Sequence, residues 1–425
     1  MLLRQLQPAG RSASVGPVAA HVRAATFAQT LCRFVNNPRI APADLLDPLL
    51  AVARRECAAA AARVRLVVHD WSTPSFPNHT RKADRATLQG HADLGYDLHR
   101  ALLVDGSDGS PLAPIGLTFR TRDEVLTTRS LPIPFADFPT AHVDPVAAAL
   151  AAVTSLALPT RLVHVIDREA DSLRHWRQWA PHHRLLVRTD DRRVERAGES
   201  VLLSELHPRL RSQGAFRAAG AARHRGRKSE LYVAEVSVTL RESARQRVDG
   251  RRKTVPGRPL ALRLVVTEVR DETGQVRASW RLLTNAPADW GTGADVARWY
   301  DFRWRIESTF ELLKSAGWEL ESRLQATGPA LLRKLLVAVG ACVRVWALER
   351  RNDAAAENLK ELLMRLSGRQ TKRSRAVTTS GLLAGLWVWQ SARTVIADTG
   401  PEAVDRLVDQ FFPLDIPAKT GNKDV

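Results

Sequence analysis

Runs of alternating apolar and polar residues, several ending in β-branched side chains, predict strands in the first half of the chain. The predicted strands span Arg63–His69, Tyr96–Leu103, Ile115–Arg122, Arg161–Ile166 and Arg184–Arg188. The second and third are joined by a turn-rich segment, so the first three form an antiparallel meander. The pair Asp144-Pro145 predicts the start of a helix that runs to about Ala157, because Asp caps helices and Pro suits the first helical position. A second helix is predicted at about Ser172–Trp179.

The pattern changes after Thr189. Further alternating segments predict an all-β insertion, with strands at Glu230–Leu240, Leu260–Val269 and Val276–Thr284. Apolar residues at three- and four-residue steps then predict one long helix over about Ala294–Ala316. The expected fold class is α/β, with a helical segment at 1–62, a core at 63–189 and 291–350, the β insertion at 190–290 and a helical region at 351–425. The segment around Ala25–Ala62 is predicted to be helical, with a break at Asn37-Pro38.

The balance of charge favours a polyanionic partner. Lys and Arg number 63 against 45 Asp and Glu, a formal net charge of +18. Such an excess is typical of proteins that bind nucleic acid, because neutralised phosphates release counterions. The excess of Arg over Lys also fits the bias of a GC-rich genome, so charge alone leaves both explanations open. The first part of the insertion is especially basic, with Arg192, Arg193, Arg196, Arg209, Arg211, Arg217, Arg223, Arg225, Arg227 and Lys228.

Other features of the composition narrow the class of protein. The three cysteines, Cys32, Cys57 and Cys342, show neither a disulfide pattern nor the spacing of zinc ligands, which suits a reducing compartment. No apolar run is long enough to cross a bilayer, and the N-terminus lacks an export signal. We therefore expect a cytoplasmic protein that does not associate with membranes.

Four polar residues of the long predicted helix, Tyr300, Arg303, Glu307 and Lys314, fall on one side of it. At about 100° per residue, their offsets confine them to an arc of roughly 60° beside the apolar stripe. The plain alternative is a solvated face on which Arg303 and Glu307 form an ion pair one turn apart.

Two aspartates add to this set, since Asp70 and Asp167 each follow a predicted apolar strand. Strand-end aspartates often cap turns or helices, and that alternative applies to each of them taken singly. Together with Glu307, however, three carboxylates can position two Mg²⁺ ions for phosphodiester chemistry.

The sequence resembles the insertion-sequence-4 family of bacterial DDE transposases. The spacing Tyr300-x2-Arg303-x3-Glu307-x6-Lys314 matches the family's Y-R-E-K signature, and Asp167-Arg-Glu-Ala-Asp171 looks like its second-aspartate motif. Asp70-Trp-Ser-Thr73 is similar to the first, where Asp-Thr-Thr is commoner. The resemblance covers about Cys32–Arg350 and implies a ribonuclease-H-like core.

The resemblance also implies roles for individual residues. Asp70, Asp167 and Glu307 would bind two catalytic Mg²⁺ ions, for which Mn²⁺ can substitute, while Tyr300, Arg303 and Lys314 would contact phosphates at the transposon end. Trp280 matches the family tryptophan that accommodates a flipped base, and packing within a strand is its alternative. Trp304 and Arg188 are expected at the DNA, with packing and an ordinary surface position as their respective alternatives. Glu169 and Asp171 are expected to be structural.

The activity implied is cut-and-paste transposition. Hydrolysis at the transposon end would free a 3′-OH, which attacks the opposite strand to form a hairpin that is reopened before strand transfer. The partners would be terminal inverted repeats and target DNA, bound by a homodimer. Two rivals remain: a decayed or repurposed DNA-binding protein without catalysis, and a nuclease with the same core. A carboxylate-based glycoside hydrolase is more distant, since it leaves the basic surface unexplained.

Overall fold

The computed structural model describes residues 30–59, 63–87, 94–128, 133–134, 144–224, 226–248, 251–315, 327–368, 377–404 and 406. The chain divides into two compact units. The larger spans Pro38–Arg351, and the smaller combines the described residues before Pro38 with those after Arg351. Among the helices in these ranges, none has an apolar run long enough to cross a bilayer.

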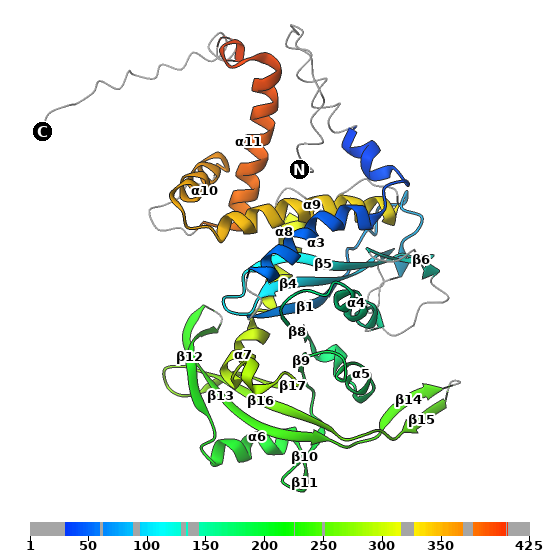
Figure 1. Cartoon of the computed structure of the whole chain (residues 1–425), viewed down its shortest axis with the longest axis vertical. Helices are drawn as coiled ribbons and strands as arrows, with labels where there is room; N and C mark the ends of the chain where they lie inside the picture. The colour runs from blue at the N-terminus through cyan, green and yellow to red at the C-terminus, as the bar shows by residue number, and fades with distance from the viewer. Residues whose placement is uncertain are drawn as a thin grey trace, which may run out of the picture. The chain divides into compact units, whose positions relative to one another are not determined.

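The larger unit is built on one mixed sheet (Figure 1), which has 13 strands in the described part of the chain. Twelve of them follow in the order β11-β10-β13-β16-β17-β9-β8-β1-β4-β5-β6-β7, and β12 pairs with β13 beside this path. The strands are β1 (Val64–Ser72), β4 (Asp97–Asp105), β5 (Pro111–Arg120), β6 (Glu124–Thr127), β7 (Ile133–Pro134), β8 (Arg161–Ile166), β9 (Leu185–Arg188), β10 (Arg193–Arg196), β11 (Glu199–Leu202), β12 (Arg217–His224), β13 (Arg227–Leu240), β16 (Leu260–Arg270) and β17 (Val276–Thr284). Two short hairpins, β2 (Ala86–Thr87) with β3 (Leu94–Gly95) and β14 (Ala244–Val248) with β15 (Arg251–Val255), stand apart from it.

Strand directions distinguish the two halves of this sheet. β1, β4 and β5 form an antiparallel meander, whereas β8 and β9 run parallel to β1. The predicted insertion extends the same sheet, since β17 pairs antiparallel with β9 and is followed by β16 and β13. The expected mixed α/β class, the meander and the main strands of the insertion are thereby confirmed.

Helices cover both faces of the sheet. On one face α3 (Pro42–Ala58) and α9 (Gly328–Glu349) pack on β5 and on each other, and α8 (Trp304–Ser315) packs on β1. α7 (Gly293–Asp301) lies against β13 and β16. On the other face α4 (Asp144–Ser155), α5 (Leu173–Trp179) and α6 (Leu203–Ser212) share an apolar core with the sheet. Its members include Leu150, Trp176, Leu206, Val266 and Leu283.

The structure corrects two expectations. The insertion is not all-β, because α6 lies within it: Leu203, Leu206 and Leu210 recur at helical spacing and are buried. The long helix predicted over Ala294–Ala316 is two helices, since α7 ends at Asp301 and α8 begins at Trp304.

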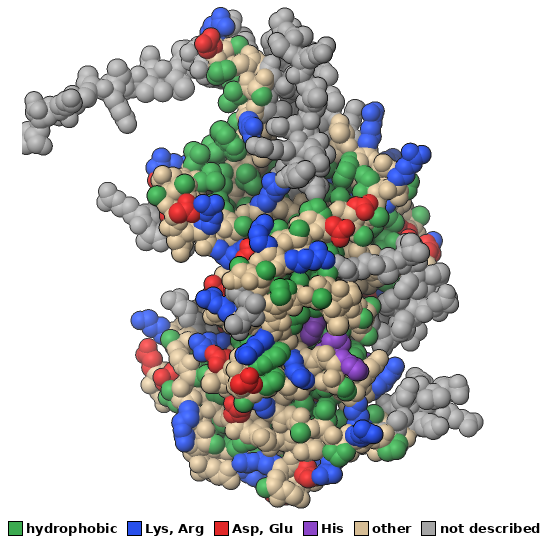
Figure 2. Space-filling view, in the orientation of Figure 1, with side chains coloured by type: hydrophobic (Ala, Val, Ile, Leu, Met, Phe, Trp, Pro, Cys, Tyr) green, Lys and Arg blue, Asp and Glu red, His purple; other side chains and the backbone are tan. Residues whose placement is uncertain are grey.

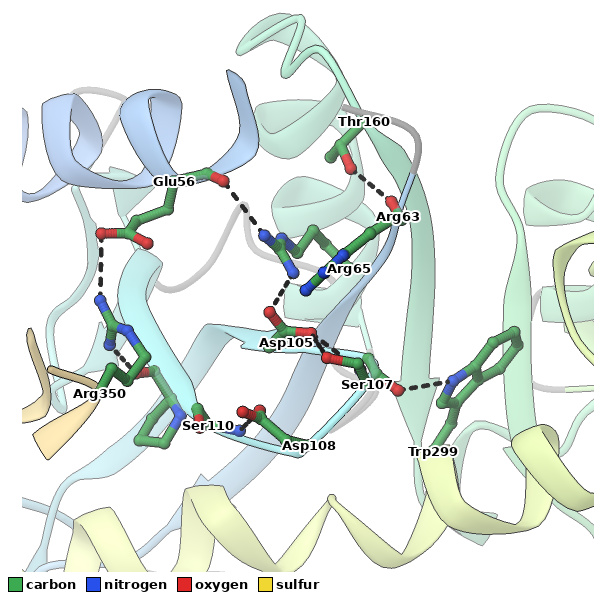
Figure 3. Close-up of polar contacts among 12 residues, drawn as sticks. Glu56, Arg63, Arg65, Asp105, Ser107, Asp108, Ser110, Thr160, Trp299 and Arg350 are labelled. Carbon is green, nitrogen blue, oxygen red and sulfur yellow. Dashed lines mark hydrogen bonds and ion pairs between the residues drawn. The ribbon is translucent and has the colours of Figure 1, made fainter. Parts of the chain in front are cut away.

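A polar network at the β4–β5 turn fixes α7 relative to β1 (Figure 3). Arg65 on β1 forms a buried ion pair with Asp105 at the end of β4. Burial alone would raise the pKa of Asp105, but the hydrogen bonds from Ser107 and the charge of Arg65 lower it. In the same turn, the Gly106 carbonyl accepts a hydrogen bond of 3.1 Å from the Trp299 indole of α7. Removal of a charge from such a buried pair typically costs several kcal/mol, so this turn is a firm support for α7.

The smaller unit contains α10 (Ala354–Leu366) and α11 (Thr379–Thr399), which pack on each other. Gly385 permits their close approach, because a Cβ at this position would collide with the backbone of Leu363. Residues 30–36 form a short helix that ends before Asn37-Pro38, as the sequence predicts.

Candidate active site

Asp70 and Asp167 lie side by side where β8 ends. The parallel pairing of β1 with β8 stops at Val68 opposite Val165, two residues before each aspartate. Side chains alternate along strands, so the two carboxylates point to the same face of the sheet. Asp70 is not at a strand end as predicted, because β1 continues along β4 to Ser72 and places Asp70 opposite Arg100.

The capping alternative for Asp167 is also present in the structure. Its Oδ1 accepts a hydrogen bond of 2.8 Å from the Arg168 amide at the start of a short 3-10 turn, Arg168–Ala170. The same oxygen accepts a hydrogen bond of 2.9 Å from the Tyr300 hydroxyl. Asp167 therefore caps a turn and contacts a residue of the predicted signature at once.

The joint between α7 and α8 brings Tyr300, Arg303 and Glu307 of the signature over these aspartates. The amides of Arg303, Arg305 and Ile306 donate to carbonyls only three residues back, which tightens the chain at the joint. Within the joint, the Phe302 ring packs against Gly109 of the β4–β5 turn, where a Cβ would collide with it. The predicted arc on one continuous helix is therefore wrong, although Tyr300, Arg303 and Glu307 do lie on the same side of the sheet as Asp70.

One guanidinium group connects the three predicted carboxylates. Arg303 Nη2 lies 2.5 Å from Glu307 Oε1 and 3.9 Å from Asp167 Oδ2, and its Nη1 lies 3.4 Å from Asp70 Oδ1. The side chains of Arg303 and Asp70 are each 17% exposed, against 26% for Asp167 and 40% for Glu307. The Arg303–Glu307 ion pair of the plain alternative is present, but it belongs to a larger half-buried cluster rather than to a solvated face.

The pKa values of the two aspartates in this cluster are shifted in opposite directions. Burial raises the pKa of Asp70 to about 6, despite the nearby charge of Arg303. Burial would also raise the pKa of Asp167, but the Arg168 amide, the Arg303 charge and the Tyr300 hydroxyl together lower it. The pKa of Tyr300 rises to about 12 because of burial and the adjacent Asp167 charge, so its hydroxyl stays protonated and able to donate. Burial opposes the charge on Arg303, yet the surrounding acids raise its pKa overall.

The donor set suits a hard cation, while its present geometry does not complete a metal site. Three carboxylates converge on one positive group, and carboxylate oxygen is the ligand type that Mg²⁺ prefers. As placed, however, no three acidic, histidine or cysteine side chains in the described ranges stand close enough to ligate one ion. Arg303 occupies the position where these carboxylates converge.

The four remaining predicted site residues are Arg188, Trp280, Trp304 and Lys314, and their surroundings differ. Arg188, at the end of β9, is near enough for its charge to contribute to the lowered pKa of Asp167 and to offset part of the rise in the pKa of Tyr300. Trp280 is half-buried on β17, and the register Leu282 opposite Arg188 places it on the Arg188 face of the sheet. Trp304 is 63% exposed, so packing does not account for it. The side chain of Lys314 lies outside the described residues.

Arg100, which the sequence analysis did not identify, lies under α8 and holds the start of that helix in place. This fully buried arginine on β4 donates a hydrogen bond of 3.0 Å to the Ile306 carbonyl and lies 4.3 Å from the centre of the Phe310 ring. Burial lowers its pKa to about 10. It anchors the first turn of α8, which carries Glu307. Its signal in the sequence was a charged residue within a segment predicted to be a core strand.

The structural role expected for Asp171 fits its contacts. Its Oδ2 accepts hydrogen bonds from the Thr189 hydroxyl at 2.7 Å and from the Asp190 amide at 2.9 Å, and Arg192 forms an ion pair with it at 2.8 Å. These contacts use both oxygens of the Asp171 carboxylate and fix the segment that leads from β9 into the insertion.

No model of a known protein family matches the sequence, and no curated protein matches it significantly.

Proposed function

We propose that the chain is a DDE transposase that cuts and joins DNA with Asp70, Asp167 and Glu307. The observation that carries this proposal is the convergence of these three carboxylates, from β1, the end of β8 and α8, on Arg303. The three are separated widely in the sequence, yet they meet beside β1 and the end of β8, two strands that run parallel. Solvated charges would have no physical reason to gather in this half-buried place.

The topology around the site supports a ribonuclease-H-like core. An antiparallel meander, β1, β4 and β5, followed by the parallel strands β8 and β9 is the arrangement expected of that core. The two aspartates lie on its central strand β1 and after its neighbour β8. The insertion continues the sheet from β9, and α8 returns the chain to the site.

Basic side chains provide a surface for DNA. Figure 2 shows Lys and Arg side chains spread over the part of the molecule where α6 and the strands of the insertion lie in Figure 1. Together with the net charge of +18, they favour binding of a phosphate backbone.

The proposed mechanism assigns a task to each side chain. Asp70, Asp167 and Glu307 would hold two Mg²⁺ ions, which supply Lewis-acid activation of the attacking and leaving oxygens when bound. In the absence of other cations, the Arg303 guanidinium offsets the charge of the three carboxylates. When metal ions replace it there, the guanidinium is free to turn toward a DNA phosphate. Tyr300 orients Asp167, and Trp280 and Trp304 offer aromatic surfaces to bases. The reaction frees a 3′-OH by hydrolysis, and that hydroxyl attacks the opposite strand to give a hairpin.

The direct test is incubation of the purified protein with Mg²⁺ or Mn²⁺ and duplexes that carry the inverted repeats flanking its gene. We expect nicks and hairpins at the repeat ends, and strand transfer into a second duplex. Cleavage without preference for the ends would support a nuclease with the same core. Salt-sensitive binding with no cleavage would support a DNA-binding protein without catalysis, and either result would contradict the transposase.

Metal binding by the Arg303→Gln variant tests the role of this arginine separately. Without the competing guanidinium, the three carboxylates should bind Mn²⁺ about tenfold more tightly, which corresponds to about 1.4 kcal/mol. The measurement is Mn²⁺ titration by calorimetry or electron paramagnetic resonance, with no DNA present. Arg305→Gln, an exposed neighbour with the same change of charge, serves as the control. Equal affinities in the two variants would show that Arg303 does not compete with metal.

A further inference from the structure

A cavity on the opposite face of the sheet is independent of the carboxylate cluster. It has a volume of about 320 Å³ and lies between α6 and β17. Its lining is polar and basic: Ser204, His207, Pro208, Arg211, Ser279 and Arg281. Because Ser279 and Arg281 alternate with Trp280 along β17, the cavity opens on the face away from Arg188 and the site.

A buried carboxylate organises the cations beside this cavity. Glu268 has no exposed side-chain surface, and it accepts hydrogen bonds from His207 at 2.7 Å, Arg211 at 2.9 Å and Arg270 at 2.7 Å. Burial would raise the pKa of Glu268, but these three partners together lower it, so the group is ionised. The Arg270 guanidinium is also held 4.1 Å from the centre of the Tyr232 ring.

Positive charge exceeds negative charge at this place even when His207 is neutral. Arg281 pairs with Asp191 at 3.1 Å, and Arg211 and Arg270 share the single carboxylate of Glu268. The cluster of Arg211, Arg270, Arg281, Glu268 and Asp191 therefore holds three guanidinium groups and two carboxylates, and Arg211 and Arg281 are the guanidinium groups that line the cavity. Arg211 retains 52% of its side-chain surface exposed, so its charge is available to a ligand in the cavity.

We propose that this cavity binds a phosphate group, from a nucleic-acid backbone or from a free phosphate compound. Guanidinium groups match the paired oxygens of phosphate, and the hydroxyls of Ser204 and Ser279 can donate to a third oxygen. The volume falls at the lower end of the range for small-ligand pockets. The partners already present hold the cations in position, so little ordering is needed on binding. This proposal does not rest on the transposase activity.

The test compares Arg281→Gln with Arg209→Gln. Both lie in the same region and lose one charge, but Arg209 pairs with Glu199 at 2.8 Å and does not line the cavity. Inorganic phosphate is titrated by calorimetry, and a labelled duplex without inverted repeats is titrated by fluorescence anisotropy at fixed salt. We expect Arg281→Gln to weaken binding of at least one probe about tenfold or more, and Arg209→Gln to change it less than twofold.

The two probes separate the two sources of phosphate. An effect on the duplex alone assigns the cavity to a nucleic-acid backbone, and an effect on inorganic phosphate assigns it to a free phosphate compound. Ser279→Glu, which places a carboxylate in the lining, should weaken the same probe. Equal behaviour of Arg281→Gln and Arg209→Gln with both probes would overturn the proposal, provided that both variants keep the wild-type circular dichroism. Neither readout involves DNA cleavage, so the two proposals can fail separately.

Discussion

Glu307→Gln should reduce metal-dependent cleavage of inverted-repeat DNA by about 10³-fold or more. The substitution keeps the size of the side chain and removes one of the three negative charges that converge at Arg303. A site that must hold two divalent cations loses both a ligand and charge balance, and such a loss corresponds to several kcal/mol of transition-state stabilisation. Single-turnover cleavage at saturating protein measures the effect without interference from DNA affinity.

The matched control for this variant is Glu311→Gln. Glu311 lies one turn further along α8, is exposed, and loses the same charge. We expect it to cleave at nearly the wild-type rate. The thermal midpoint of Glu307→Gln should also stay near that of the wild type, since its side chain is 40% exposed and its ion pair contributes little to folding. Wild-type cleavage by Glu307→Gln would remove this residue from the proposed metal site.

Much of this site could be predicted because its elements have strong local signals. The apolar runs before Asp70 and Asp167 are confirmed as β1 and β8, and the register between these strands brings the two aspartates together. The sequence also predicts a helical segment that carries Glu307. Local patterns suffice for these features because strands and helices impose distinct periodicities on their buried faces.

The features that could not be predicted depend on contacts between distant residues. The apolar stripe continues from Trp299 through Phe302 to Ile306, so the break between α7 and α8 has no signal in periodicity. The break coincides with packing of Phe302 against Gly109, almost two hundred residues earlier. Arg100 likewise gains its role only when β4 pairs with β1 and α8 packs above them. The partners of Glu268 come from β16 itself and from α6, which the alternating pattern of the insertion concealed.

A ladder of buried histidines on the face away from the carboxylates should make the fold sensitive to acid. His69 on β1 lies 3.3 Å from His99 on β4 and 2.9 Å from His164 on β8, measured between ring nitrogens. His183 continues the ladder, with its ring 5.5 Å from that of His164. A neutral imidazole donates at one ring nitrogen and accepts at the other, whereas an imidazolium can only donate, so two neighbouring members of the ladder cannot both be protonated and still share a hydrogen bond.

Burial lowers the pKa of His164 to about 3 and, with the neighbouring rings, places the pKa of His69 well below its usual range. In the unfolded chain these groups take up protons near pH 6.5. The free energy of unfolding is therefore highest above about pH 6.5 as far as these groups are concerned, and it declines as the pH falls toward 3, because only the unfolded state binds the protons. For His164 alone the loss is about 1.4 kcal/mol per pH unit, or about 5 kcal/mol over this range.

Urea denaturation at a series of pH values between 7.5 and 4 measures this effect. The free energy of unfolding of His164→Gln should fall less steeply with decreasing pH than that of the wild type, by about 1.4 kcal/mol per unit below pH 6. The slope is the informative quantity, because a packing defect in the variant lowers the free energy of unfolding by the same amount at every pH. His182→Gln, an exposed histidine beside the ladder, should keep the wild-type slope. Identical slopes for His164→Gln and the wild type would mean that His164 is not held neutral by its burial.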